Sequence, residues 1–335
     1  MKVLVIGGTR FLGYHLTRAL LELGIKVTLF NRGISSDDFG DRVTRIKGDR
    51  QNHQQFYEQF QGQKYDVVID LIGYHPLELE VAEKTFRDHI GLYVFISTGQ
   101  VYLVTENKNW PAREEDFYQP LIPCPSGEEL PYEYGMKKRE CELLLEERFR
   151  SRKFPAVRFR CPVIHGPRDY SLRMYSYLLR IQDGYPLIIP ENGDKIIRHI
   201  YVQDVVKTIL KVLPEVSVRG KVFNLAQDEV VTLSKFLTLA AALLKKEIRI
   251  VTVSQLELRE HSISPDISPF SGRWVSYLDP AYARQEIGFS TTPLPQWIPE
   301  VISYFFQQYQ GAPPENYQFR DKEMAYLQKV LPGYF

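Results

Sequence analysis

The chain has 335 residues, of which 44% are hydrophobic and 25% charged, enough for one large domain or two joined ones. Lys and Arg number 42 against 41 Asp and Glu, a balance that argues against an extended nucleic-acid-binding surface. No apolar run approaches the roughly 18–20 residues of a membrane span. The 3 cysteines lack a C-x-x-C spacing and the 7 histidines form no ligand-spaced cluster, so we expect a cytoplasmic protein without a structural metal.

The first 32 residues follow the order strand, glycine-rich turn, helix, strand. Val3–Ile6 and Val27–Phe30 are short apolar runs typical of buried parallel strands, and leucines recur at helical spacing between them. The turn reads GGTRFLG: Gly7 permits a sharp turn, Gly13 lets the helix approach the sheet, and N–H groups at the helix start can receive a pyrophosphate. This segment predicts half of a dinucleotide-binding fold. The cofactor contacts that it predicts are Gly7, Thr9, Arg10, Phe11, Leu12 and Gly13.

The turn resembles that of the extended and atypical short-chain dehydrogenase/reductases, the NAD-dependent epimerase/dehydratase family, whose spacing is G-x-x-G-x-x-G. Arg10 stands where the middle glycine is expected, as in an atypical branch that includes chloroplast stem-loop-binding proteins. The resemblance covers residues 1–308 and implies a Rossmann-type doubly wound parallel sheet with a smaller C-terminal α/β substrate-binding lobe. We expect the NAD(P)-binding domain over 1–167 with about 200–226, and the lobe over 168–199 and 227–335.

The end of the second strand bears on the choice between NAD and NADP. Enzymes that select NAD commonly have an acidic residue here for the ribose 2′-hydroxyl, whereas an arginine accommodates a 2′-phosphate. This chain has Asn31 and Arg32, and Arg10 can add charge beside the same phosphate. The sequence therefore favours NADP(H), with NAD(H) as the alternative.

Further apolar runs over 44–47, 66–70, 93–97 and 157–160 alternate with helical segments, which predicts a parallel sheet with right-handed crossovers. In the family that the chain resembles, the ends of these strands border the cofactor. The resemblance thereby implies cofactor contacts from Asp49, Arg50, Leu71, Ile72, Gly73, Ser97, Cys161, Pro162, Val163 and Ile164.

Three residues are expected to carry the chemistry. Residues 97–102 read STGQVY, similar to the family's S-S/T-x-x-V-Y, whose catalytic hydroxyl lies three residues before the valine; this is Thr98, with Ser97 as the alternative. Tyr134 and Lys138 lie four residues apart on one face of a predicted helix over about 132–150. A free tyrosine has a pKa of about 10, and a lysine ammonium nearby favours the phenolate. Tyr134 can then exchange a proton with a substrate hydroxyl or carbonyl as hydride moves to or from the nicotinamide. By resemblance, both also contact the cofactor, and Lys138 holds the nicotinamide ribose.

The part of the chain after residue 102 is expected to bind a small-molecule substrate. Residues 103–131 are rich in proline and acidic residues and lack periodicity, which predicts a loop that acts as a lid. From residue 168 the chain is basic and aromatic; in extended relatives this part covers the substrate, and arginines bind a diphosphate bidentately. The expected substrate contacts are Tyr102, Arg173, Arg180 and Arg198. Helices that bear the tyrosine motif often pair in this family, so the resemblance also implies a homodimer.

Three functions fit these patterns. The leading hypothesis is an NAD(P)-dependent oxidoreductase or epimerase acting on a nucleotide sugar or a related hydroxyl or carbonyl compound, where the substrate class rests on family analogy. Gly99 and Gln100 follow Thr98, and 4,6-dehydration, which calls for an acidic residue there, is disfavoured. The second hypothesis is an NADPH-dependent carbonyl reductase of a biosynthetic intermediate. The third is a non-catalytic relative that senses a cofactor or binds RNA; such relatives usually lack the tyrosine–lysine pair.

Overall fold

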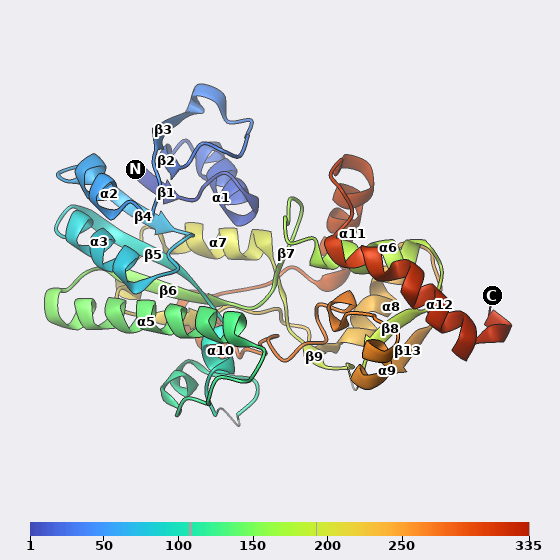
Figure 1. The fold of residues 1–335 in the computed structure, drawn as a ribbon. Coiled ribbons are helices and arrows are strands. Elements are labelled where there is room, and N and C mark those ends of the chain that lie inside the picture. Colours follow the sequence, from blue (N-terminus) through green and yellow to red (C-terminus); the bar gives the residue numbers. More distant parts are fainter. Residues whose placement is uncertain (107–108, 192, 335) are drawn as a thin grey trace. The chain divides into compact units, whose positions relative to one another are not determined.

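The computed structural model describes residues 1–106, 109–191 and 193–334, and the chain forms two compact units (Figure 1). Unit 1 comprises residues 1–164, 200–226 and 276–291, and unit 2 comprises residues 165–199, 227–275 and 292–335. Residues 276–291 therefore pack with the N-terminal unit, whereas the sequence pattern placed them in the C-terminal lobe. Two short strands, β7 (Ile164–His165) and β10 (Ile200–Tyr201), lie where the chain passes from one unit to the other.

Unit 1 is built on a seven-stranded sheet in the order β11-β6-β5-β4-β1-β2-β3, with every neighbouring pair parallel. Its strands are β1 (Lys2–Ile6), β2 (Lys26–Asn31), β3 (Val43–Lys47), β4 (Tyr65–Asp70), β5 (Ile90–Thr98), β6 (Ala156–Cys161) and β11 (Val222–Asn224). The strand order reverses between β1 and β4, and ligands of doubly wound sheets bind at the carboxyl ends of strands beside such a point. The predicted Rossmann-type fold is confirmed.

Helices cover both faces of this sheet. They are α1 (Phe11–Glu22), α2 (His53–Phe60), α3 (Pro76–Phe86), α4 (Gln100–Leu103), α5 (Glu129–Arg152), α7 (Val202–Val212) and α10 (Ala281–Ile287). Figure 1 has α2, α3 and α5 along one face, and α1 packs beside α7 on the other. Among the residues that the structure describes, no helix has both the length and the apolar character of a membrane span.

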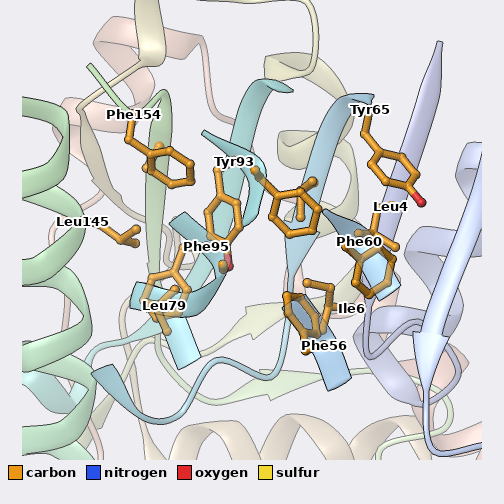
Figure 2. Close-up of a cluster of buried hydrophobic side chains, with 14 of the residues drawn as sticks. Leu4, Ile6, Phe56, Phe60, Tyr65, Leu79, Tyr93, Phe95, Leu145 and Phe154 are labelled. Carbon is orange, nitrogen blue, oxygen red and sulfur yellow. The ribbon is translucent and has the colours of Figure 1, made fainter. Parts of the chain in front are cut away.

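An aromatic core fills the face that α2, α3 and α5 cover (Figure 2). Alternate residues of each strand point to the same face, so Leu4 and Ile6 of β1 share this face with Tyr93 and Phe95 of β5, and β4 lies between the two strands. Phe56 of α2 packs edge-on against Phe30 of β2, with ring centroids 5.2 Å apart. This packing fixes the strand ends, and with them the loops that carry the predicted site residues.

The predicted lid over 103–131 is only in part irregular. It begins at the last residue of α4 and contains a 3-10 turn, Glu114–Tyr118. Backbone bridges join Thr105 to Leu121, and Ala112 to Leu278. Residues 107 and 108 of this predicted loop lie outside the described residues. Ala112 and Phe117 are buried in unit 1, whereas residues 118–131 are exposed or half-buried.

Unit 2 combines short strands with helices. Its strands are β8 (Leu187–Pro190), β9 (Ile196–Ile197), β12 (Val231–Thr232) and β13 (Ile250–Val253), and its helices are α6 (Arg173–Gln182), α8 (Leu233–Leu243), α9 (Gln255–Glu260), α11 (Leu294–Ser303) and α12 (Arg320–Val330). β13 runs parallel to β8, and β12 runs antiparallel to β9. Tyr326 and Leu327 of α12 are buried in one cluster with Ile188 and Val253. The C-terminal segment, for which the sequence suggested no role, is thus part of the core of unit 2.

Candidate active site

The glycine-rich turn joins β1 to α1, and its glycines leave no room for a side chain at their own positions. Gly7 has φ +92°, and a Cβ atom on it would lie 2.7 Å from Cγ2 of Ile72. A Cβ atom on Gly13 would lie 2.3 Å from the carbonyl oxygen of Gly7, so α1 packs directly against the strand end. Arg10 is the N-cap residue of α1, no side chain of the described residues gives this helix a capping hydrogen bond, and its first turn contains no acidic residue. Of the other predicted contacts, Thr9 and Leu12 are buried and Phe11 is half-buried. The turn fits a pyrophosphate, which needs close backbone approach and N–H donors at a helix start.

The ends of β2 and β3 bring a second basic side chain close to Arg32. Asn31 pairs with Lys47 in the parallel register, and its Oδ1 accepts a hydrogen bond from the backbone N–H of Gly33 at 2.8 Å. A Cβ atom on Gly33 would lie 3.0 Å from Cε of Lys47. Arg32 and Lys47 are both exposed. Lys47 was not predicted as a cofactor contact, and its signal in the sequence is its place at the end of the third strand.

A buried ion pair fixes the end of β4. Arg50 donates from Nη2 to Oδ2 of Asp70 at 2.7 Å, and the hydroxyl of Tyr93 donates to the same oxygen at 2.5 Å. Oδ1 of Asp70 accepts from the backbone N–H of Ile72 at 3.1 Å and so holds the loop that follows β4. The structure therefore places Arg50 in the core of unit 1, while Asp49 is exposed at the end of β3.

Lys138 lies buried on α5 with its ammonium group between the ends of β4 and β5. Nζ donates to the carbonyl oxygens of Gly73 at 2.9 Å and Ile96 at 2.7 Å. Burial is the largest influence on the pKa of Lys138 and lowers it below that of a free lysine. The adjacent Lys137 is directed elsewhere, to an ion pair with Glu133 at 2.5 Å. Of the two lysines, the structure thus brings only Lys138 to the strand ends.

Tyr134 lies one helical turn before Lys138, where α5 packs closely on α4. A Cβ atom on Gly135 would lie 3.1 Å from the carbonyl oxygen of Gln100. This close approach places the Tyr134 turn beside the residues that directly follow Thr98. The Tyr134 side chain is 36% exposed and so is open to a ligand.

The two candidate hydroxyls at the end of β5 have different surroundings. Ser97 donates from Oγ to Oε1 of Glu142 at 2.5 Å, and Glu142 accepts from Nη2 of Arg160 at 2.7 Å, all three residues being buried. Thr98 is half-buried, and its Oγ1 accepts from the backbone N–H of Gln100 at 3.2 Å. The hydroxyl of Ser97 is engaged in a buried network, so Thr98 is the better placed of the two.

The site residues named above lie within the segment that also matches a known family. Residues 3–226 match the NAD dependent epimerase/dehydratase family. The chain belongs to this family. Membership confirms the resemblance that the glycine turn, the STGQVY segment and the tyrosine–lysine pair indicated.

One relative of this epimerase/dehydratase chain is the chloroplast stem-loop binding protein of 41 kDa b from Arabidopsis thaliana. The two are 28% identical over 244 residues, which cover 69% of this chain and 60% of the plant protein. The chain therefore spans about three fifths of the length of that curated relative.

Solved structures share the fold. The dTDP-glucose 4,6-dehydratase from Bacillus anthracis, in complex with NAD, superposes with a TM-score of 0.71 at 18% identity, covering 92% of this chain and 97% of that one. The UDP-glucose 4-epimerase from Thermotoga maritima, with UDP-glucose, gives 0.71 at 19% identity, covering 91% and 98%. At these identities the likeness establishes the fold.

In this family member, the predicted segment 161–164 lies directly beside the end of β5. The carbonyl oxygen of Cys161 accepts from the backbone N–H of Gly99 at 2.8 Å, and that of Val163 accepts from Ile200 at 3.0 Å. Burial raises the pKa of the Cys161 thiol to about 12, which keeps it neutral. Pro162 and Val163 are buried and Ile164 is half-buried.

The predicted substrate contact Tyr102 is buried in unit 1. Its hydroxyl donates to Oδ1 of Asn224 at 2.8 Å and accepts from Nη1 of Arg160 at 2.5 Å. Burial raises the pKa of Tyr102 above its ordinary value, so the phenol is neutral. These partners engage both hydrogen-bonding roles of the Tyr102 hydroxyl within the fold.

The three arginines predicted to bind a diphosphate lie in unit 2 with separate partners. Arg180 donates from Nη2 to Oε1 of Glu323 at 2.6 Å, and both are buried. Arg198 is buried and donates from Nε to the carbonyl oxygen of Gln227 at 2.7 Å. Arg173 is half-buried and is thus the most accessible of the three.

One neighbour of the site was not predicted. The ring centroid of Tyr74 lies 6.4 Å from that of Tyr134 and 5.5 Å from Nζ of Lys138. The available signal was its position directly after Leu71–Gly73, a segment already expected to line the cofactor.

Proposed function

We propose that this protein is an NAD(P)-dependent oxidoreductase or epimerase that acts on a hydroxyl or carbonyl group of a nucleotide sugar. The supporting observation is the ammonium group of Lys138, which is buried and bonded to two carbonyl oxygens, one helical turn after Tyr134 and next to the strand that ends in Thr98. A bound nicotinamide cofactor supplies the hydride donor or acceptor. The glycine turn is proposed to hold its pyrophosphate.

Tyr134 is the proposed proton-transfer residue. The Lys138 ammonium favours the phenolate, so Tyr134 takes a proton from a substrate hydroxyl during oxidation and returns one during reduction. The Thr98 hydroxyl bonds to the same substrate oxygen and orients it. Lys138 has three N–H donors; two bond to Gly73 and Ile96, and we assign the third to a ribose hydroxyl.

For the cofactor we propose a preference for NADP(H) over NAD(H). Arg32 and Lys47 place two exposed cations at neighbouring strand ends, and Asn31 leaves this position without a carboxylate. A 2′-phosphate gains from such cations, whereas the 2′-hydroxyl of NAD commonly bonds to an acidic residue. Arg10, the N-cap residue of α1, is a third cation that we propose for the same phosphate.

The packing at Gly99 supports epimerisation or simple reduction over 4,6-dehydration. A dehydratase of this kind calls for an acidic residue beside the catalytic threonine. A Cβ atom on Gly99 would lie 2.2 Å from Oγ and 2.6 Å from Cβ of Ser276, so this position has no room for a side chain. Gln100, the next residue, is neutral.

Two other functions remain candidates. The cations Arg32 and Lys47 suit an NADPH-dependent carbonyl reductase of a biosynthetic intermediate. The name of the Arabidopsis relative suggests stem-loop RNA binding, against which stand the net charge of +1 and the retained Tyr134–Lys138 pair. We further propose a cytoplasmic location, because the three cysteines are unpaired. We also propose a homodimer, because the chain resembles a family whose members often pair, and light scattering on the purified protein tests this.

The test is a fluorescence titration of the purified protein with NADPH and with NADH. Arg32→Ala is compared with Arg18→Ala, an exposed arginine paired with Glu22 on α1. We expect Arg32→Ala to weaken NADPH binding by about tenfold or more, as for loss of a charge-assisted hydrogen bond, and Arg18→Ala to leave it unchanged. NADH affinity should not respond to either change.

Hydride transfer is then measured with UDP-glucose and dTDP-glucose as first substrates. Tyr134→Phe should retain NADPH binding and lose turnover. Tight NAD binding indifferent to Arg32 would contradict the 2′-phosphate assignment. If neither cofactor binds, the proposed enzymatic function is contradicted. RNA binding then becomes the leading candidate, and titration with a stem-loop RNA tests it.

A further inference from the structure

The loop between β4 and α3, residues 71–75, is held at both ends by buried carboxylates. Asp70 accepts from the backbone N–H of Ile72 at 3.1 Å. Glu78, which is 3% exposed, accepts with Oε2 from the backbone N–H groups of Tyr74 at 2.7 Å and His75 at 3.1 Å. The backbone of Tyr74 is therefore fixed, and with it the position of the Cβ atom that carries the ring.

The ring of Tyr74 lies against both members of the tyrosine–lysine pair. Its centroid is 5.5 Å from Nζ of Lys138, while the ring of Phe95 lies 4.2 Å from Nζ. Its plane is tilted by 50° to that of Tyr134. Lys138 is 2% exposed and Tyr74 is 42% exposed, so the Tyr74 ring stands at the surface beside an ammonium group that water barely reaches.

An aromatic cover at this place has two physical effects. A ring face attracts a cation and offsets part of the cost of removing the ammonium group from water. Exclusion of water also strengthens the electrostatic influence of Lys138 on its neighbours, because the local dielectric constant falls. Both effects require the aromatic ring, and neither requires the phenolic hydroxyl.

We propose that Tyr74 is a positioning residue of this site: its ring shields the Lys138 ammonium group from water and packs against the ring of Tyr134. The proposal rests on the proposed function for the role of the pair, but its geometry can be tested without cofactor or substrate. Under this proposal, the loop after β4 positions the tyrosine–lysine pair in addition to lining the cofactor.

The experiment measures how fast the ammonium group of Lys138 is acetylated in the full-length protein. The protein is treated with acetic anhydride, digested with chymotrypsin and analysed by mass spectrometry. The adjacent Lys137, half-buried and paired with Glu133, is the internal reference. Tyr74→Ala and Tyr74→Gln remove the ring, and Tyr74→Phe keeps it. Tyr57→Ala is the matched control, since Tyr57 also carries a lysine over its ring, with Nζ of Lys84 4.7 Å from the centroid.

We expect acetylation of Lys138, relative to Lys137, to rise by about tenfold in Tyr74→Ala and Tyr74→Gln, as for loss of a partly desolvated cation–π contact. Tyr74→Phe and Tyr57→Ala should match the wild type, and Tyr74→Gln keeps the test valid if Tyr74→Ala folds poorly. No rise in either ringless variant overturns the proposal. An equal rise in Tyr74→Phe, which would assign the effect to the hydroxyl, or in Tyr57→Ala also overturns it. Failure of NADPH to bind removes the proposed function and leaves the acetylation result standing.

Discussion

The buried pair of His165 and His199 is predicted to make unit 2 unstable in acid. Nε2 of His165 and Nδ1 of His199 are 2.7 Å apart, and the ring centroids of Phe270 and Trp297 lie 5.3 and 5.4 Å from that of His165. Burial, with a smaller contribution from the Arg173 cation, lowers the pKa of His165 to about 3. Burial also sets the pKa of His199 well below its ordinary value, with smaller contributions from His165 and Arg173. Both imidazoles are therefore neutral in the folded protein.

The sign and size of the effect follow from proton linkage. Both pKa values are lowered on folding from about 6.5, so the stability that the pair contributes is complete above about pH 6.5. Below that pH the unfolded chain binds protons that the native state does not, and stability is lost. At pH 5, about 1.5 units lower, each histidine costs about 2 kcal/mol and the pair about 4 kcal/mol. This is a large share of a typical unfolding free energy of about 5–15 kcal/mol.

Urea unfolding at pH 7.5, 6 and 5, followed by tryptophan fluorescence, measures this loss. The comparison is with the double variant His165→Gln, His199→Asn, because the amide atoms of Gln and Asn can take the places of the bonded Nε2 and Nδ1 without titrating. His261→Gln, at the C-cap of α9 in the same unit, is the matched control. The double variant should lose about 4 kcal/mol less than the wild type between pH 7.5 and 5. An equal loss in both proteins would refute the reasoning.

Three other changes have expected outcomes. Arg180→Met should lower the free energy of unfolding by up to about 3–5 kcal/mol in urea, because the buried Glu323 loses one of its two arginine partners and keeps only Arg320, whereas Arg18→Met at the surface should cost less than about 0.5 kcal/mol; similar costs would contradict this. Glu114→Gln should raise the melting temperature more at pH 8 than at pH 5. Burial raises the pKa of Glu114 to about 7, so the stability that Glu114 contributes is lost as the pH rises from 4.5 through 7. A change in melting temperature that is the same at both pH values would contradict this prediction. Gly13→Ala should abolish NADPH binding measured by calorimetry, because the added methyl group would meet backbone 2.3 Å away; unchanged affinity would disprove the close approach.

Much of the fold could be predicted because its causes are local. Strands buried on both faces form continuous apolar runs, so β1 and β4 were recognisable from a few residues each. Gly7 and Gly13 marked the turn because the positive φ of Gly7 and the close approach of Gly13 to the carbonyl oxygen of Gly7 both lie within seven residues of chain. The spacing of Tyr134 and Lys138 placed both on one helical face, and the structure brings the ammonium group to the strand ends as that spacing requires.

The partners of buried charged residues could not be predicted in the same way. Arg180 lies among aromatic and basic residues, as a phosphate-binding arginine does, yet its carboxylate partner Glu323 comes 143 residues later. Arg50 follows a strand end where a cofactor contact was expected, and it pairs instead with Asp70 in the core. Such pairs depend on which elements pack together, and the sequence of one segment does not indicate its packing partner. Tyr74 escaped notice for the same reason, since its neighbours come from α5.

Unit 1 is completed late in translation, because its last segment is residues 276–291. They leave the ribosome long after β11, the edge strand that they cover: Phe223 stacks on Tyr282 with centroids 5.3 Å apart, and Lys221 pairs with Glu286 at 2.6 Å. Until then the side chains of Phe223 and Lys221 at this edge strand lack their partners, and incompletely packed edge strands are where aggregation begins. A fragment that stops at residue 226 would never acquire these contacts, so we expect it to need chaperones that the whole chain needs only briefly.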